Sequence, residues 1–317
     1  MSSPTVLFSV NVDVTNPGQF YACCGLFELT SRLWPSSQGW FSLRNAAFTI
    51  RSVLGAPSTF VAVVESLVKT GIEGDLTAEE RNELAHLESQ KRSLAKQEKK
   101  LTKTNEERRS FLGERQREGA LTLGDPFKLR LDWWQEAGDD VPKTFAGRQG
   151  VLRMARAMLS EVTEAVHSEA PLDYRCFLKV AQAMPRKTKK RKDVRKETDE
   201  SKVEPFYFDA KRFAHALDTG FSLDVQERNI RASAAPLTEL LALVGLQRFR
   251  PRQTADDKWS FEYFAWNEPM GVVAAAAIAC GSVLTTDQTG FRFRLQFRDD
   301  QKRYKAFGFA TPNGGQP

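Results

Sequence analysis

The alternation of apolar and polar residues at the start of the chain predicts a β-strand followed by a helix. Apolar side chains occupy every second position from residue 6 to residue 14, which is typical of a strand with one buried face. The turn sequence Thr15-Asn16-Pro17-Gly18 ends this strand. Residues 19–33 then carry an apolar stripe at helical spacing, made of Phe20, Cys23, Cys24 and Phe27. With short strands over 40–50 and a helix over 59–69, the chain opens as β-α-β-α.

Residues 76–118 predict a long charged helical insertion. They are rich in Glu, Lys, Arg and Gln and contain no proline, and Thr77 with Glu80 forms the sequence of a capping box. Leucines at 87, 94 and 101 recur every seven residues, but the alternate layer is partly polar, so the seam is thin. The insertion could pack on its own domain, fold back as a hairpin near residues 103–105, or project. A self-pairing coiled coil is less favoured, because about three clean heptads are needed.

The rest of the chain mixes helices and strands. We expect an α+β core to continue over 119–183, with a strand over 127–134 and a helix over 147–166. Residues 184–204 carry almost no apolar side chain and are interpreted as a basic and acidic mobile loop. The C-terminal portion, 205–317, predicts a short strand at 206–209, a helical turn at 211–218, helices at 237–249 and 270–281, and strands at 258–266, 291–298 and 303–309.

This order predicts the fold class. Helices and strands do not alternate regularly, which favours an α+β fold with a mixed, mostly antiparallel sheet packed by helices over a doubly wound fold. The expected portions are an N-terminal unit (1–75), the helical insertion (76–118), a core continuation (119–183), the loop (184–204) and the C-terminal portion (205–317).

The charge is concentrated in one run. The chain has 317 residues, of which 41% are hydrophobic and 27% charged, which excludes a globally disordered or fibrous protein. The net charge is +6, but residues 186–196 (RKTKKRKDVRK) alone contribute +7, so the remaining residues sum to −1. A contact between this run and nucleic acid would involve Arg186, Lys187, Lys189, Lys190, Arg191 and Lys192. The other interpretation is a solvated loop.

Composition also bears on location and cofactors. The longest stretch of small apolar residues, 270–280, is too short to span a bilayer, and we see no basic leader at the start. The four cysteines form no CxxC pair, and we interpret them as buried free thiols in a reducing cytoplasm. We therefore predict a cytoplasmic protein with no membrane contact, no metal and no cofactor.

The clearest candidate for chemistry is an arginine-bearing strand. Residues 291–298 alternate so that phenylalanines fall on one face and Arg292, Arg294 and Arg298 on the other. Arginine donates hydrogen bonds in a fork that suits phosphate, so this face could bind nucleic acid. The alternative is a solvated face whose arginines pair with acids elsewhere in the chain.

Two further sites are candidates for anion binding. Arg248, Arg250 and Arg252 follow a predicted helix, where cations either stabilise the helix dipole or contact phosphates. The turn around Asn16, Gly18 and Gln19 precedes a helix N-terminus, which favours anions, although a plain helix start fits equally.

Catalysis has little support in the sequence. The chain has three histidines, and only His215 lies in a basic neighbourhood. No partner acid or base for it is identifiable, and no metal, phosphate-loop or hydrolase motif is present. We therefore predict that the chain is not an enzyme.

Three stretches resemble a known family. They are residues 12–29 (VDVTNPGQFYACCGLFEL) followed by Arg32-Leu33-Trp34-Pro35, residues 205–209 (PFYFD) with 215–218 (HALD), and residues 240–251 (LLALVGLQRFRP). Together they resemble the Csb-family proteins of type I-G CRISPR-Cas systems, formerly type I-U. The resemblance implies a non-catalytic, large-subunit-like component of a Cascade-like effector complex in antiviral defence. Its partners would be crRNA, target DNA, other CRISPR-associated effector subunits and a helicase-nuclease.

Three functions therefore stay open from the sequence. The first is a nucleic-acid-binding subunit that contributes to target DNA binding and to recognition of the adjacent motif. The second is a crRNA-processing ribonuclease that uses His215. The third is an adaptor that holds another protein through the leucine-bearing helix over residues 84–101.

Overall fold

The computed structural model describes residues 6–52, 59–135, 145, 150–176, 178–180, 201–212, 233–298 and 304–313. The elements of the first half are β1 Val6–Asn11, α1 Pro17–Leu33, β2 Gln38–Ser42, η1 Leu43–Asn45, β3 Ala47–Ser52, α2 Phe60–Thr70, β4 Glu73–Gly74, α3 Ala78–Lys96, α4 Lys103–Glu118, β5 Leu121–Leu123 and β6 Leu129–Leu131. Those of the second half are α5 Val151–Leu159, α6 Val162–Val166, β7 Lys179–Val180, β8 Ser201–Lys202, α8 Pro236–Arg248, β9 Arg252–Gln253, β10 Ser260–Trp266, β11 Met270–Gly271, α9 Val272–Ala279, β12 Gln288–Phe297, β13 Lys305–Phe307 and β14 Thr311–Pro312.

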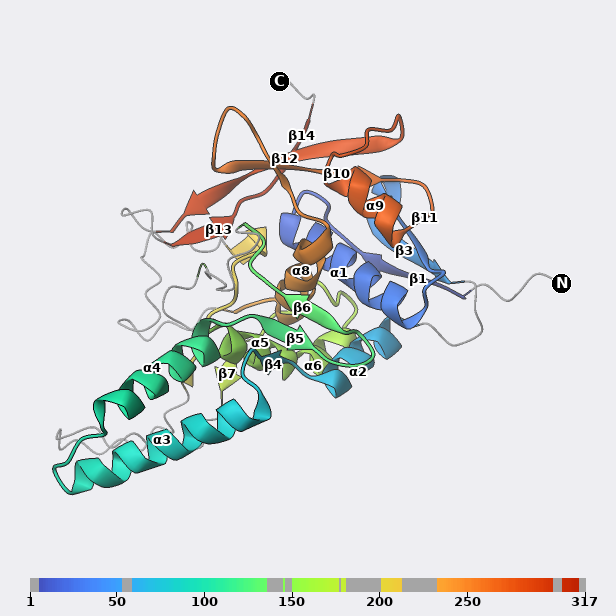
Figure 1. Cartoon of the computed structure of the whole chain (residues 1–317). Coiled ribbons are helices and arrows are strands. Elements are labelled where there is room, and N and C mark those ends of the chain that lie inside the picture. The colour runs from blue at the N-terminus through green and yellow to red at the C-terminus, as the bar shows by residue number, and fades with distance from the viewer. Residues whose placement is uncertain are drawn as a thin grey trace.

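The two larger of four described antiparallel sheets and a central helix pair form most of the body of the molecule. One of these sheets has the order β1-β3-β2-β11, and the other the order β13-β12-β10-β9 with β14 on the edge of β12; the smaller sheets are β4-β5-β6 and β7-β8. Figure 1 shows α1 and α8 side by side beneath the C-terminal sheet, and these two helices make the most extensive contact between any two described elements. Buried residues from Val10 to Ala310 join in one hydrophobic cluster, so both ends of the chain share a core. The prediction of an α+β fold with antiparallel sheets is confirmed.

Helix α1 is buried far more completely than its sequence predicts. Its apolar residues suggest one buried face, yet every residue from Pro17 to Thr30 is buried. The helix lies against α8, and its Phe20 ring also packs on Phe41 of β2 and Tyr263 of β10. A helix covered on all sides tolerates polar residues only where they find partners, which explains why Glu28 in α1 is paired with arginines.

The crossing of α1 and α8 depends on two glycines. A Cβ atom at Gly25 would lie 1.9 Å from the carbonyl oxygen of Leu241, and one at Gly245 would lie 2.1 Å from that of Tyr21. The two backbones are therefore in direct contact, which only glycine allows on each helix. Gly25 and Gly245 belong to two of the stretches that resemble the Csb family, and both therefore have a packing role in this fold.

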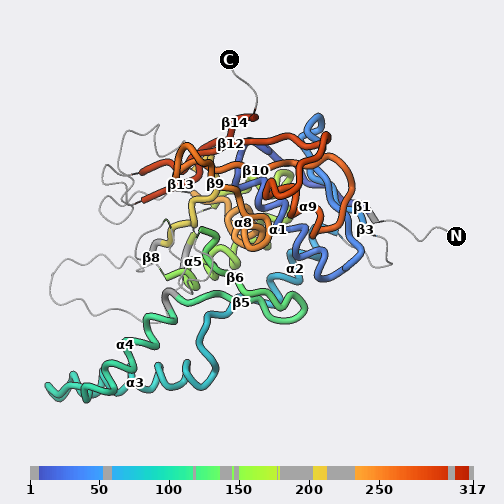
Figure 2. Tube along the Cα trace, turned by 45° about the horizontal axis from the view of Figure 1, so that its top comes forward, coloured from blue at the N-terminus to red at the C-terminus, as the bar shows by residue number. Residues whose placement is uncertain are grey.

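The charged insertion folds back on itself as a helical hairpin. Helices α3 and α4 run side by side and project from the body (Figures 1 and 2), with Leu84, Leu87 and Leu112 buried at the base. Thr77 and Glu80 form the predicted capping box. The turn between the helices covers residues 97–102, earlier than the turn expected at 103–105. Of the three arrangements considered, the hairpin and the projecting helix both apply.

Several short elements differ from the sequence-based expectation. The helix expected over 147–166 is two helices, α5 and α6, and the strand expected over 127–134 is the three-residue β6. The strand expected at residues 206–209 does not form, because Tyr207 is left-handed with φ of 67°. The backbone N–H groups of Phe208 and Asp209 instead donate to the buried Glu239 carboxylate.

Two other expectations concern thiols and the membrane. Cys23 and Cys24 are buried free thiols whose pKa values are raised by burial, and Cys176 and Cys280 are free and partly buried. Among the described residues, no helix combines the length and apolar character needed to cross a bilayer.

Candidate nucleic-acid interface

The arginine-bearing strand is β12, and its two faces separate as the alternation predicts. Phe291, Phe293 and Leu295 are buried, whereas Arg292 and Arg294 are exposed. The register places Phe293 opposite Phe261 and Phe291 opposite Tyr263 on β10, with stacked rings in both pairs. These aromatic pairs fix the strand in the core and hold the arginines outward.

Three predicted arginines meet on this outer face. Glu262 of β10 lies opposite both Arg292 of β12 and Arg252 of β9. Arg252 Nη2 contacts Glu262 Oε2 at 2.8 Å, and Arg292 Nε contacts Glu262 Oε1 at 3.4 Å. Arg294 follows two positions along β12 on the same face. The sheet therefore gathers arginines that are far apart in sequence, since residues 252 and 292 lie on different strands.

The same face also carries acids. Arg292 donates two hydrogen bonds to Asp256, each 3.1 Å long, and Arg294 Nε lies 3.0 Å from Asp257 Oδ2. Hydrogen bonds, first from Thr254 and then from its own backbone, lower the pKa of Asp256, and Arg292 adds to this. This is the alternative predicted from sequence, in which the arginines pair with acids of the chain. Because these pairs are open to solvent, they contribute little to stability.

An open pocket lies within this face. Its volume is about 510 Å³, and its polar lining includes Arg252, Glu262 and Arg292. The apolar part of the lining comes from Phe264, Leu284 and Pro312. Guanidinium groups beside an apolar wall suit a ligand that combines phosphate with a flat ring, as a nucleotide does.

Arg298 differs from the other two arginines of the strand. Its side chain is only 10% exposed, and its guanidinium carbon lies 3.4 Å from the centre of the Tyr207 ring. It donates to the carbonyl oxygen of Phe145 at 2.6 Å and lies 3.8 Å from Glu204. The expectation that it shares the exposed face is wrong, because Tyr207 covers its guanidinium beyond the end of β12.

Arg248 is likewise tied to the core. Its guanidinium makes two hydrogen bonds to Glu28, whose side chain is 1% exposed, and Arg32 contacts the same carboxylate at 2.7 Å. Burial alone would raise the pKa of Glu28, but hydrogen bonds from Arg248 and Arg32 outweigh this and lower it. Arg248 thus joins α8 to α1. Arg250 is partly exposed, two residues beyond the end of α8.

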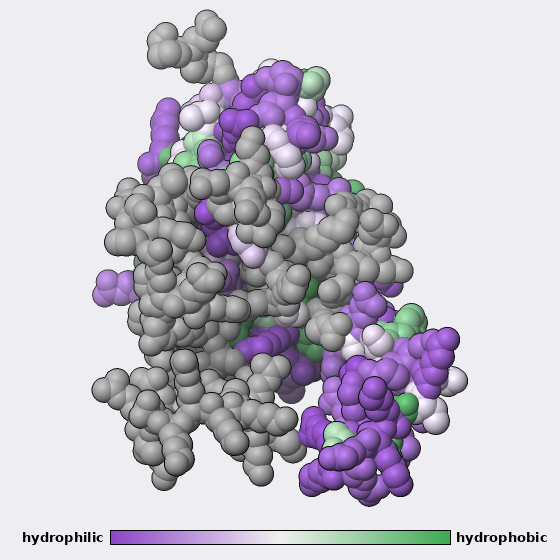
Figure 3. Space-filling model, turned by 90° about the vertical axis from the view of Figure 1, so that its left-hand side faces the viewer, coloured by the Kyte–Doolittle hydropathy of each residue, from purple (hydrophilic) through white to green (hydrophobic). Residues whose placement is uncertain are grey.

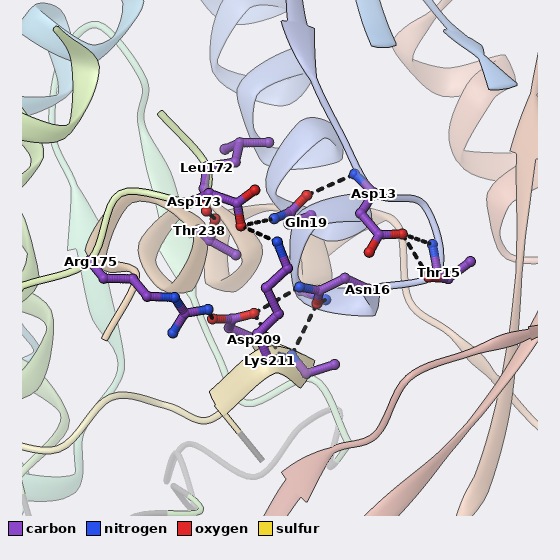
Figure 4. Close-up of polar contacts among 12 residues, drawn as sticks. Asp13, Thr15, Asn16, Gln19, Leu172, Asp173, Arg175, Asp209, Lys211 and Thr238 are labelled. Carbon is purple, nitrogen blue, oxygen red and sulfur yellow. Dashed lines mark hydrogen bonds and ion pairs between the residues drawn. The ribbon is translucent and has the colours of Figure 1, made fainter. Parts of the chain in front are cut away.

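The predicted anion-binding turn is occupied by the chain itself (Figure 4). Asn16 caps α1 by accepting from the backbone N–H of Gly18, and it also accepts from Ala210 N and donates to Asp209. A Cβ atom at Gly18 would lie 2.4 Å from the carbonyl oxygen of Phe208. Gln19 donates to Asp173 at 2.8 Å. The first turn of α1 is therefore covered by residues 208–210 and is closed to an external anion.

Sequence reasoning missed the acidic pair at this junction. Asp209 accepts from Asn16 and Arg175, and Glu239 of α8 accepts from the backbone of Phe208 and Asp209. Burial, and then the charge of Asp209, raise the pKa of Glu239 to about 8. The pair joins the starts of α1 and α8 through residues 207–210. No signal in the sequence links residues 16, 209 and 239, although all belong to or adjoin the stretches that resemble the CRISPR-associated family.

The remaining candidates lie outside the described residues. These are His215 and the basic residues Arg186, Lys187, Lys189, Lys190, Arg191 and Lys192. The roles predicted for them remain predictions. Within the described ranges, no group of three or more His, Cys, Asp or Glu side chains is placed to hold a metal ion.

Comparison with known proteins adds no relative. No family model, no curated protein and no solved structure matches this chain. The assignment of function therefore depends on the residues described above and on the sequence resemblance.

Proposed function

We propose that this protein is a non-catalytic nucleic-acid-binding subunit of a crRNA-guided, Cascade-like effector complex. The observation that carries the nucleic-acid part of this proposal is the outer face of the C-terminal sheet, where Arg252, Arg292 and Arg294 are exposed together. We call this surface the arginine face. The effector-complex part rests on the sequence resemblance, which implies crRNA, target DNA, other effector subunits and a helicase-nuclease as partners.

The ion pairs on this face are suited to exchange with phosphate. Arg292 already donates two roughly parallel hydrogen bonds to the exposed carboxylate of Asp256, which is the arrangement in which arginine binds a phosphate. The Asp256 side chain is 63% exposed, so it can turn away without burying an unpaired charge. The phosphate would take over hydrogen bonds from a guanidinium that the strand already orients.

The charge of the chain favours binding within a complex. Outside residues 186–196 the sequence carries a net charge of −1, and the acids on the arginine face offset its cations. We therefore expect weak binding to duplex DNA by the isolated chain, with specificity supplied by base pairing to a guide and by other subunits. Tight sequence-specific binding by the chain alone would contradict this.

The test compares two double variants that remove the same charge. Arg292→Gln/Arg294→Gln alters the arginine face, and Arg81→Gln/Arg130→Gln alters arginines of similar exposure on α3 and β6 that are also ion-paired. We expect the first variant to weaken duplex DNA binding by about eightfold per lost contact at 0.1 M salt and to reduce the salt slope by about two. The control should change neither.

Stability measured on the same variants completes the test. Substitutions at exposed positions should leave the free energy of unfolding within about 0.5 kcal/mol of the wild type. A lowered melting temperature with unchanged DNA binding would mean that the arginines only pair with acids, and the proposal would fail. Cleavage of repeat RNA that disappears in His215→Ala would favour the ribonuclease instead.

A further inference from the structure

The outer half of the α3–α4 hairpin carries a net positive charge, on a part of the molecule separate from the arginine face. Residues 88–111 contain eight basic and four acidic residues, a net charge of +4. None of these residues is buried, since Leu87 and Leu112 are the last buried positions on the two helices. At 1.5 Å per residue, Lys96 lies about 14 Å beyond Leu87 along the helix axis. This half of the hairpin therefore adds nothing to the buried core.

Most basic residues along the hairpin are paired with glutamates. Lys91 contacts Glu106 at 2.7 Å, and Arg108 contacts Glu83 at 2.8 Å. These two pairs join α3 to α4 across the hairpin. Arg92 and Arg109 pair within their own helices, with Glu88 and Glu106. Such pairs hold the two helices in register and leave little free charge on the sides of the hairpin.

The end of the hairpin differs from its sides. It carries four lysines and one acid, Glu98, within eight residues, and the lysines are Lys96, Lys99, Lys100 and Lys103. Lys103 lies 3.9 Å from Glu107 and is 92% exposed, so this contact is weak. For the other three lysines, no ion pair occurs within the described part of the chain. We call these four lysines the lysine tip.

The composition of the tip indicates the chemistry of its partner. Figure 3 shows the projecting hairpin as a mostly hydrophilic surface with small apolar patches, and Phe111 of α4, nearer the base, is 50% exposed. The apolar residues nearest the tip, Leu94 and Leu101, are both partly buried. An apolar protein surface or a bilayer interior would find little to bury there. A polyanion would meet four exposed lysine ammonium groups.

We propose that the lysine tip binds the phosphate backbone of duplex nucleic acid. This rests on the proposed function and adds a second contact, on a different element from the arginine face. Two packed helices, each about 10 Å across, are too wide to enter a major groove of about 12 Å. Lysine binds phosphate as a point charge. The contact is therefore with phosphates and independent of sequence.

The lysine tip lies far from the arginine face. Figure 1 shows β12 at the top of the molecule and the α3–α4 hairpin projecting from the opposite side of the body, so the tip contact stands on its own. Because α3 and α4 are joined by ion pairs across the hairpin and are anchored by buried leucines at the base, the tip is presented by a defined structure. The tip therefore loses less conformational entropy on binding than a disordered basic tail would lose.

The experiment compares two pairs of lysines. Lys99→Gln/Lys100→Gln removes two charges from the tip, and Lys69→Gln/Lys128→Gln removes two from exposed positions on the body. Binding of a fluorescently labelled mixed-sequence DNA duplex is followed by anisotropy across a salt series. We expect the tip variant to lower the salt slope by about two and to weaken binding by about eightfold per lost contact at 0.1 M salt. The body variant should match the wild type.

A second readout locates the contact directly. Duplex DNA should protect Lys99 and Lys100 from acetylation more than it protects Lys69 and Lys128, measured by mass spectrometry on the wild-type chain. Equal protection, or equal salt slopes for the two double variants, would overturn the proposal. Poly-glutamate is titrated in the same way as the duplex. If Lys99→Gln/Lys100→Gln loses poly-glutamate binding while its duplex binding is unchanged, the proposal is overturned in favour of an acidic protein partner.

The outcomes separate this inference from the proposed function. If the tip variant binds like the wild type while Arg292→Gln/Arg294→Gln binds weakly, only the lysine tip is refuted. If the wild type binds no nucleic acid under any condition of the series, both proposals fail.

Discussion

The substitution Gly25→Ala tests the packing of α1 against α8. In a helix interior, replacing glycine by alanine normally gains about 1 kcal/mol, because alanine is the better helix former. Here the added Cβ would lie 1.9 Å from the carbonyl oxygen of Leu241, whereas real Cβ atoms stay at least 3.0 Å from such an atom. Local propensity and tertiary packing therefore predict opposite signs for the change in stability.

The size of the effect follows from what has to move. The atom in contact belongs to the backbone of α8, so no side-chain rotation relieves the clash, and the helices must separate by about 1 Å. The neighbouring Gly245 then loses its own contact with the carbonyl of Tyr21, and the Glu28–Arg248 pair one turn away is stretched. Overpacking of this kind costs about 1–3 kcal/mol, and we expect at least the upper value.

Urea unfolding followed by far-ultraviolet circular dichroism measures this change. Gly124→Ala is the control, because nothing lies within 4 Å of a Cβ atom there. It should alter the free energy of unfolding by less than about 1 kcal/mol. A Gly25→Ala protein as stable as the wild type, or more stable, would refute the close approach of the two helices.

Three further outcomes are expected. Arg248→Gln should lower the free energy of unfolding by about 2 kcal/mol near neutral pH, below the range for fully buried pairs because Arg248 is 37% exposed. The loss should shrink as pH falls below 4.5 and through the lowered pKa of folded Glu28, because below that pKa the carboxyl group is protonated in both states. The pKa of Glu239 is raised to about 8, so the free energy of unfolding of the wild type, measured with urea, should fall as pH rises from 4.5 to 8. In Glu239→Gln this dependence on pH should be smaller. An equal fall in both proteins would contradict the raised pKa. Arg298→Gln should lower the melting temperature, because Arg298 is 10% exposed and lies against Tyr207. Its DNA binding, measured by anisotropy, should be unchanged. Weaker DNA binding at an unchanged melting temperature would show that Arg298 contacts the DNA.

Periodicity and composition were enough to predict most of the longer regular elements and the fold class. The strand at β1, the helices α1, α2 and α8 and the alternation of β12 all follow from local hydrophobic patterns, which side-chain geometry imposes on helices and strands. The capping box at Thr77 also follows from nearby residues, whereas the hairpin of the insertion was one of three arrangements that the sequence left open. The arginine face was predictable as a strand face, since alternate residues of a strand point to opposite sides.

Tertiary structure decided which charged residues are free. Arg292 and Arg298 belong to one predicted strand face, yet one is exposed and the other lies against Tyr207, because residues distant in sequence cover the end of β12. The turn at Asn16 resembles an open helix N-terminus, but residues 208–210 close it, and the link to Asp209 spans 193 residues. Local patterns set how a segment folds, whereas the partner of a buried charge is set by where the whole chain brings another group. For that reason the sequence could propose these cations as sites, and only the fold could separate the exposed ones from those bound in the core.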